Sequence, residues 1–247
     1  GADITLSRAF ASNVTGSLLV GYSNESYLRL SPELLTEAKP DFRVGVRLSF
    51  RPDEKTSVST SYDSLNRQST VSAYRAEGNG IGRWDTSVNV QQLGYTDTTN
   101  ASASFGYYGN RGEVNVSHYG DATGPIFDAK NTAAVTQRSS VRVGASVAFA
   151  DGVVAVGPPI RGGAFAIVHP HDSIAGKEIT VGDSDYVRAK ADRWGPAVVT
   201  DVPAYSSSTV PVDVADLPLG YSLGAGGFDL RGSYRAGYAL EVGSAYS

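Results

Sequence analysis

Two histidines and an aspartate lie close together in the stretch "HPHD", as His169, His171 and Asp172. These residue types bind zinc, and histidine also titrates near neutral pH, so the stretch suggests a metal site or a pH-sensitive site. Pro170 between the histidines and the loop-like setting favour a plain exposed turn instead. Ser173 follows, but no sharp strand-to-helix turn frames it as a nucleophile. We therefore expect neither catalysis nor metal binding from this stretch.

Two further stretches have the composition of ligand-binding loops. "GNGIG", residues 78–82, has the glycine content of a phosphate-binding loop, but such loops lead into a helix and here a strand pattern follows. We predict a hairpin turn. "GDSD", residues 182–185, could bind calcium weakly, but EF-hand spacing is missing and solvated loop acids are the better interpretation. No motif supports an enzyme, a cofactor or a small-molecule substrate, and we predict none of the three.

The bulk composition limits the partners of the chain. It has 247 residues, of which 41% are hydrophobic and 19% charged, and a net charge of −4. A nucleic-acid partner would require a basic stripe, and none is visible. The absence of cysteine excludes disulfides, and the absence of methionine indicates a mature segment or a fragment. No apolar run approaches the roughly 20 residues of a transmembrane helix, although a barrel strand needs only about 10 alternating residues.

Residues 3–149 predict an antiparallel sheet. Apolar and polar residues alternate there in short segments, as they do in strands that separate two faces. The clearest segments are "FRVGVRLSF" (42–50) and "VRVGASVAF" (141–149). Helical periodicity is missing almost everywhere, although "SPELLTEAK" (31–39) could form one helical turn. Strands are predicted at 3–10, 14–23, 42–51, 56–62, 68–76, 83–92, 100–108, 112–119 and 139–149.

The connections between these strands form two groups. Every second connection is a tight turn, and these turns are "ASN", "PDEK", "EGNGIG" and "NRG". The connections between them lie at the opposite ends of the strands and include both long loops, residues 24–41 and 121–137. Short turns at one end of the strands and longer loops at the other are typical of outer-membrane barrels, whose short turns face the periplasm.

The alternation also separates an apolar face from a polar one. We interpret the apolar face as lipid-facing and the polar face as a lumen of small side chains: Ser57, Ser59, Ser61, Ser87, Asn89, Gln91, Ser102 and Ser104. The aromatic residues near strand ends are candidates for the girdle at the membrane interface: Tyr62, Trp84, Tyr107 and Phe149. A soluble sheet with one solvated face would show the same alternation, and this alternative stays open.

The size of the side chains on the polar face indicates the size of the barrel. A small closed barrel must fill its interior with bulky or charge-paired side chains. The small side chains here therefore favour an arc of a larger barrel. Arg43, Arg47 and Arg142 on this face could line a translocation path or pair with acids across the barrel wall, and the sequence does not separate these two roles.

Residues 152–247 have a different character. They contain most of the prolines and read as short strands with frequent turn signals, which is typical of a small β-sandwich. The predicted strands are "VVAVG", "GAFAIVH", "KEITVG", "DYVRAK", "GPAVVTD", "STVPVDV", "GFDLRGS" and "AGYALEVG". The predicted fold class is all-β, with a barrel arc over residues 1–151 and a sandwich over residues 152–247.

Four motifs carry a resemblance to a known family. They are "G-x-x-F-A-I-V" (162–168), "V-T-D-x-x-x-Y" (199–205), "V-D-x-x-x-L-P" (212–218) and "R-x-G-Y-A-L" (235–240), and they follow a last barrel strand that ends at 149–152. This pattern resembles the outer-membrane ushers of the chaperone–usher pilus pathway, most closely the archaic, spore-coat-U-like branch. The resemblance is specific over about residues 146–245 and diffuse before them.

The resemblance implies a fold, a location and partners. Ushers are very large barrels in the bacterial outer membrane that move folded pilin subunits outward without ATP. Their C-terminal periplasmic domains bind periplasmic chaperone–pilin complexes. The chain would be the closing arc of such a barrel, in contact with lipid, followed by the first C-terminal domain in the periplasm, with 152–247 as the partner-binding region and no individual contact residue assigned.

The chain departs from the usher pattern in two features, and two alternative functions stay open. Many ushers read "V-P-Y" where this chain has Pro203-Ala204-Tyr205, and many carry a cysteine pair that is absent here. One alternative is another outer-membrane barrel, a porin or adhesin with a periplasmic domain. The other is a secreted two-domain β-sandwich protein that binds a partner, which would stay monodisperse without detergent.

Overall fold

The chain folds almost entirely into β-strands. The computed structural model describes residues 2–23, 41–123, 133–161, 163–215, 217, 221, 223–224 and 226–244. No helix in this part of the chain is long and apolar enough to cross a membrane. The helical turn predicted at 31–39 and nearly all of the loop predicted at 24–41 lie outside the described residues. The loop predicted at 121–137 is too long, because residues 121–123 and 133–137 belong to strands. The predicted all-β class with antiparallel sheets is confirmed.

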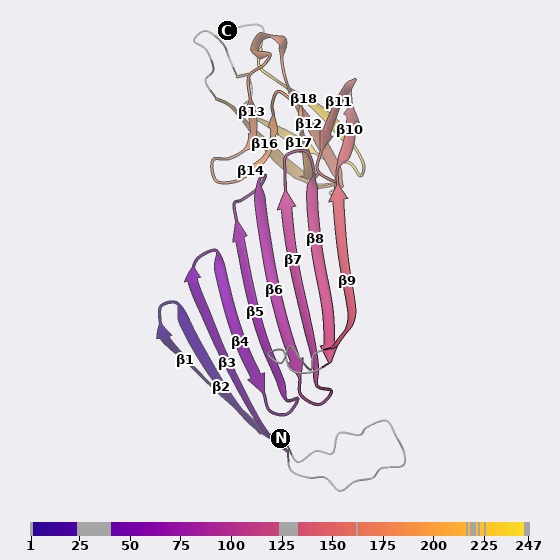
Figure 1. Ribbon diagram of the computed structural model, residues 1–247. Coiled ribbons are helices and arrows are strands. Elements are labelled where there is room, and N and C mark those ends of the chain that lie inside the picture. The colour runs from indigo at the N-terminus through magenta and orange to yellow at the C-terminus, as the bar shows by residue number, and fades with distance from the viewer. Residues whose placement is uncertain are drawn as a thin grey trace. The chain divides into compact units, whose positions relative to one another are not determined.

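The first part of the chain forms a nine-stranded sheet in which each strand pairs with the next (Figure 1). Alternating residues and tight turns produce this meander, as predicted. Its strands are β1 (Ala2–Ala11), β2 (Val14–Ser23), β3 (Asp41–Asp53), β4 (Thr56–Asp63), β5 (Gln68–Glu77), β6 (Arg83–Leu93), β7 (Thr98–Tyr108), β8 (Glu113–Thr123) and β9 (Ala133–Gly144).

The prediction of one strand over 139–149 is wrong. The strand leaves the sheet at Ala145, and β10 (Ser146–Ala150) pairs instead with β11 (Val153–Gly157). The reason is packing, because the side chains of Ala148 and Ala150 are buried in a separate hydrophobic cluster. Phe149, predicted as a girdle residue of the barrel, therefore lies outside the nine-stranded sheet.

Register separates the two faces of the sheet over β1–β5. On one face Leu18 pairs with Val46, which pairs with Tyr62. On the other face Ser59 pairs with Ser72, and their hydroxyl oxygens lie 2.7 Å apart. Large residues of the first face are exposed, among them Ile4, Leu6, Phe42, Val46 and Leu48. The predicted alternation of an apolar and a polar face is confirmed for these strands.

The chain divides into two compact units. One consists of residues 1–76, 85–105 and 116–140, and the other of residues 77–84, 106–115 and 141–247, which we call the C-terminal unit. The C-terminal unit therefore includes two turns of the meander, between β5 and β6 and between β7 and β8. The domain boundary near residue 151 stays a prediction from the sequence.

The C-terminal unit contains all eight short strands expected after residue 152. They are β11, β12 (Ala164–Pro170), β13 (Ile179–Gly182), β14 (Val187–Ala191), β15 (Ala197–Val202), β16 (Ser207–Val214), β17 (Gly227–Arg231) and β18 (Gly237–Val242), with a 3₁₀ turn at Asp172–Ile174. Apart from β11, which pairs with β10, they form a three-stranded sheet in the order β15-β12-β18 and a four-stranded sheet in the order β14-β13-β16-β17. The pairing of β12 with β18 is parallel.

Buried side chains join these sheets into three layers. Ala166 and Val168 of β12 pack toward the four-stranded sheet, in a core that includes Ile179 and Val210. Ile167 points the other way, into a second cluster with Ala148, Ala150, Ala155 and Val198 from the β10–β11 hairpin and β15. Burial of each such aliphatic side chain stabilises the fold by about 1.5–3 kcal/mol. The three-stranded sheet is thus covered on both faces.

Candidate functional site

Three of the four motifs that carry the usher resemblance meet at one corner of the C-terminal unit. The Tyr205 N–H donates to the carbonyl of Gly232 at 2.6 Å, and Ala204 forms an isolated bridge with the same glycine. The Arg235 N–H donates to the carbonyl of Gly163. We call these five residues the motif corner. The fourth motif, 212–218, extends along β16 and lies partly outside the described residues.

Glycine is required where the segments approach each other. A Cβ on Gly163 would collide with the side chain of Ala204. A Cβ on Gly232 would lie 2.5 Å from the carbonyl oxygen of Pro203. Real Cβ atoms essentially never come that close, so a larger residue would push the turns apart.

Together with the adjacent Tyr234, the motif corner presents two tyrosines and an arginine to solvent. Tyr205 and Tyr234 are 74% and 60% exposed. The guanidinium carbon of Arg235 lies 5.3 Å from the centre of the Tyr234 ring. Tyr205 and Arg235 both have positive φ angles, 62° and 61°, which are strained for residues with side chains. Exposed tyrosine and arginine are typical of protein-binding hot spots, so this corner is suited to binding a protein surface.

A second cluster holds the turn between β7 and β8 against the rest of the C-terminal unit. Nη1 of Arg111 donates to the carbonyls of Val156, at 2.9 Å, and Pro196. Nη2 donates to Oδ1 of Asp192 at 2.6 Å and to the Gly195 carbonyl at 2.7 Å. One guanidinium thus joins the turn to β11 and to the turn between β14 and β15. We call this cluster the arginine junction.

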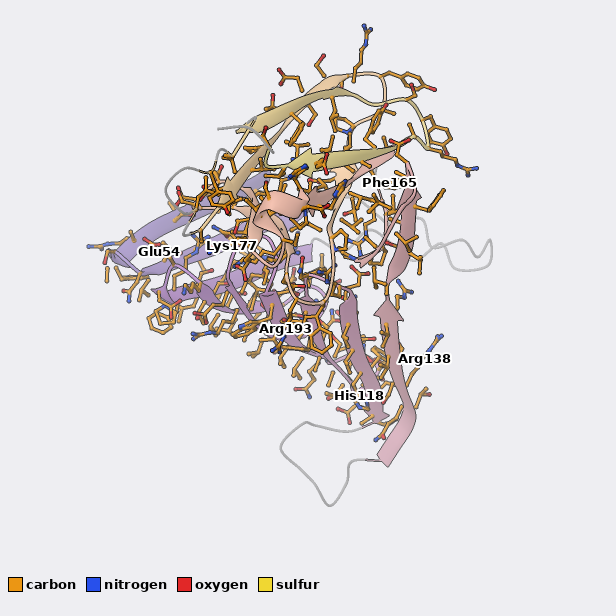
Figure 2. The ribbon with its side chains drawn as sticks, turned by 90° about the horizontal axis from the view of Figure 1, so that it is seen from above. Glu54, His118, Arg138, Phe165, Lys177 and Arg193 are labelled. Atoms are coloured by element: carbon orange, nitrogen blue, oxygen red, sulfur yellow. The ribbon has the colours of Figure 1, made fainter. Side chains whose placement is uncertain are left out.

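Asp192 is held ionised by this arrangement. Partial burial raises the pKa of its carboxyl, but the hydrogen bond and charge of Arg111 and the N–H of Trp194 outweigh burial. The net result is a pKa below its ordinary value. The neighbouring Arg193, labelled in Figure 2, has its guanidinium carbon 5.1 Å from the centre of the Trp194 ring.

Both meander turns of this unit cover the edge of β14. The amide of Asn110 donates to the Lys190 carbonyl at 2.8 Å, and its oxygen accepts from the Lys190 N–H at 2.9 Å. In the other turn the Ile81 N–H donates to the Val187 carbonyl at 2.9 Å, next to a parallel bridge between Gly80 and Val187. The prediction that "GNGIG" is a hairpin turn is confirmed.

A cavity of about 230 Å³ lies beside these turns within the C-terminal unit. Its walls carry two ion pairs, Arg161 with Glu113 and Arg188 with Asp201, the second at 2.5 Å. The guanidinium of Arg83 stacks over the ring of Tyr108, 4.2 Å from its centre. Because each of these arginines is engaged by a neighbour, we interpret the cavity as a polar seam between turns and strands.

The "HPHD" stretch forms a capping turn. Nδ1 of His171 accepts from the Ser173 N–H at 3.1 Å and lies 2.9 Å from the Ser173 hydroxyl oxygen. His169 and Pro170 are the last two residues of β12 and are half-buried, so the prediction of a plain exposed turn is wrong for them; Asp172 begins the 3₁₀ turn. Over the described ranges, no group of three or more His, Cys, Asp or Glu side chains is placed to hold a metal ion.

The "GDSD" stretch is also a turn. Oδ1 of Asp183 accepts from the N–H groups of Asp185, at 3.0 Å, and Tyr186, at 2.6 Å. This carboxylate therefore closes the connection between β13 and β14, as expected for a loop acid.

Of the three arginines predicted on the polar face, Arg43 has a partner on the neighbouring strand. Its guanidinium binds the carboxylate of Asp63 at 2.5 and 3.0 Å, across the β3–β4 pair. For Arg43 the structure therefore favours the wall ion pair over a free cation. Arg47 is exposed on the same face of β3, and Arg142 is exposed on β9.

Sequence reasoning missed the arginine junction. "NRG" was predicted only as a tight turn, and Asp192 had no predicted role. Arg111 and Asp192 are far apart in the chain, so no local spacing connects them. The only available signal was that "NRG" is one of the short turns that the sequence groups at one end of the strands.

Comparisons with known proteins support the fold. No family model and no curated protein sequence matches the chain. Among solved structures, it is similar to a chain of an E. coli P pilus tip assembly intermediate, PapC-PapD-PapK-PapG, with a TM-score of 0.53 and 17% identity. The alignment covers 96% of this chain and 27% of that chain, so this chain spans about a quarter of its neighbour. The Bacillus anthracis TIE protein aligns with a TM-score of only 0.22 and 9% identity over 97% of this chain and 40% of that one, which supports no argument.

Proposed function

We propose that the chain is the closing part of an outer-membrane usher, a pore and assembly platform for pilus subunits that periplasmic chaperones deliver. The observation that carries the proposal is the combined fold. A meander with an exposed apolar face, followed by a small layered β-unit, aligns over 96% of the chain with a component of a pilus assembly intermediate. The four sequence motifs support the same family from independent data.

In this proposal the apolar face of β1–β5 contacts outer-membrane lipid. The polar face, with its serine rows and the Arg43–Asp63 pair, faces a water-filled lumen. The C-terminal unit lies in the periplasm. The protein acts by binding and guiding subunits, without catalytic residues or a cofactor.

The motif corner is the proposed contact for a chaperone–pilin complex. Tyr205 and Arg235 are exposed and have strained positive φ angles, and backbone hydrogen bonds to Gly232 and Gly163 fix them. Such pre-organised aromatic side chains lose little conformational freedom on binding.

The test is capture of purified periplasmic chaperone–pilin complexes by the full chain in detergent, with free chaperone as the comparison. Selective capture of the loaded complexes is expected, and Tyr205→Ala combined with Tyr234→Ala should weaken it about tenfold or more, as for hot-spot residues. The matched control is Tyr95→Ala, since Tyr95 is 68% exposed in the turn between β6 and β7. Equal capture by all variants would contradict the assignment of the motif corner as the contact. If a folded chain captured no complex, the usher proposal itself would be contradicted.

A further inference from the structure

The β10–β11 hairpin has an exposed face made only of apolar side chains. Val147 pairs with Val156, and Phe149 pairs with Val154. These four residues are 47–73% exposed, whereas alanines on the opposite face of the hairpin are buried against β12 and β15. The exposed patch amounts to roughly 400 Å², which is the size of the largest apolar patch on a typical monomer, and such patches are often functional. The only charge in the hairpin is Asp151, at its tip.

The patch continues an apolar run that starts in β9. Gln137 and Ser139 are exposed polar positions, and Ser139 lies 2.8 Å from Nδ1 of His118. From Val141 onward, however, every second residue is apolar and exposed, up to Phe149 in β10. Val141 and Val143 alone are too short a stretch for a membrane, because a spanning strand needs about 9–11 residues.

The run matches the strand of the meander with the clearest apolar face. In β3 the exposed apolar residues alternate from Phe42 to Phe50. From Val141 to Phe149 the chain has the same length and the same alternation, although Ala145 interrupts the strand. When β10 is included, the exposed apolar run that begins at Val141 reaches the length of the run in β3.

From this we propose that the outward face of the β10–β11 hairpin contacts the acyl chains of the bilayer and anchors the C-terminal unit at the membrane. This inference rests on the proposed outer-membrane function and deepens it. A lipid partner fits because the patch is uncharged and continues the run of β9, and because its length matches that of β3.

The experiment uses single cysteines, since the native chain has none. Phe149→Cys and Val154→Cys are labelled with an environment-sensitive fluorophore in the full chain, reconstituted into phosphatidylethanolamine–phosphatidylglycerol vesicles with spin-labelled acyl chains. Val46→Cys on the apolar face of β3 is the lipid-facing reference, and Glu241→Cys, exposed on β18, is the aqueous reference. The expected result is acyl-chain quenching at 149 and 154 close to that at 46, with none at 241.

The references separate failure of this inference from failure of the proposed function. Quenching at 46 without quenching at 149 and 154 would overturn the hairpin anchor and leave the membrane location intact. Protection of 149 and 154 from both acyl-chain and aqueous quenchers would also overturn it, since the patch would then be covered by protein. No quenching at 46 would contradict the outer-membrane proposal itself.

Discussion

Replacing Arg111 with alanine removes the guanidinium that joins the β7–β8 turn to β11 and to the β14–β15 turn. The side chains of Arg111 and Asp192 are each 24% exposed, so the pair is screened by solvent only in part. Removing one partner of a buried pair destabilises a protein by about 3–5 kcal/mol, and each hydrogen bond to a charged group contributes about 1.5–3 kcal/mol without being additive. With a discount for exposure, we expect Arg111→Ala to lower the free energy of unfolding of the C-terminal unit by about 2–3 kcal/mol.

Denaturant unfolding of the full chain in detergent, followed by the fluorescence of Trp194, measures this change. Trp194 belongs to the site, because its backbone N–H donates to Oδ1 of Asp192 at 2.9 Å. A Trp84→Phe background makes Trp194 the only tryptophan. Arg231→Ala, at an exposed position of β17, is the matched control and should change the free energy by less than about 0.5 kcal/mol.

A double-mutant cycle divides the effect between the ion pair and the carbonyl bonds. Asp192→Ala combined with Arg111→Ala should give a coupling energy of about 1–2 kcal/mol. The rest of the loss comes from the hydrogen bonds of Arg111 to backbone carbonyls. A loss for Arg111→Ala no larger than that for Arg231→Ala would refute the argument that this guanidinium holds the turn.

Three further predictions follow from single residues. The pKa of Asp192 is lower in the folded state than the unfolded value of about 3.9. The stabilisation by its carboxylate is therefore present above that pH and is lost as the pH falls through the folded pKa. The unfolding free energies of wild type and Asp192→Asn should converge in acid. Gly80→Ala should destabilise by about 2 kcal/mol or more because its Cβ would strike the backbone of β14, whereas Gly82→Ala, with the same positive φ and open space, should show only the strain of about 1–2 kcal/mol in the same unfolding assay. Val46→Arg on the apolar face should reduce stability in bilayers by about 2–4 kcal/mol, and Ser59→Arg on the polar face by much less; equal losses would contradict the assignment of lipid and lumen faces.

The strands could be predicted because their information is local. A period of two, bounded by turn residues, defined β1–β8 within a few residues and located every short strand after residue 152, whereas β9 begins at Ala133 and not at the predicted residue 139. The exception is β10. The alternation from Val141 to Phe149 is unbroken, so nothing in it marks the departure at Ala145. That departure depends on Ala148 and Ala150 packing against Ile167, a contact that a local pattern does not contain.

The candidate site was predictable only as separate pieces. The motifs that contain Tyr205 and Arg235 were recognised, but their meeting requires the parallel pairing of β12 with β18, which brings the end of the chain beside Gly163. Sequence gives no register for a pairing of strands so far apart. The strain at Tyr205 and Arg235 was equally invisible, because non-glycine residues with positive φ have no reliable local signature.

The contacts that position the meander turns also cover the open edge of the four-stranded sheet. β14 is an edge strand of the four-stranded sheet, and an open edge is a template for unwanted pairing. Asn110 occupies both the N–H and the carbonyl of Lys190 with one side-chain amide, and the N–H of Ile81 occupies the carbonyl of Val187. A side-chain amide satisfies these groups but cannot pass the hydrogen-bond ladder on to another strand. An asparagine at the tip of a short turn therefore closes the edge of β14 while it fixes the turn, and Asn110→Ala should expose the Lys190 amide to hydrogen exchange without unfolding the unit.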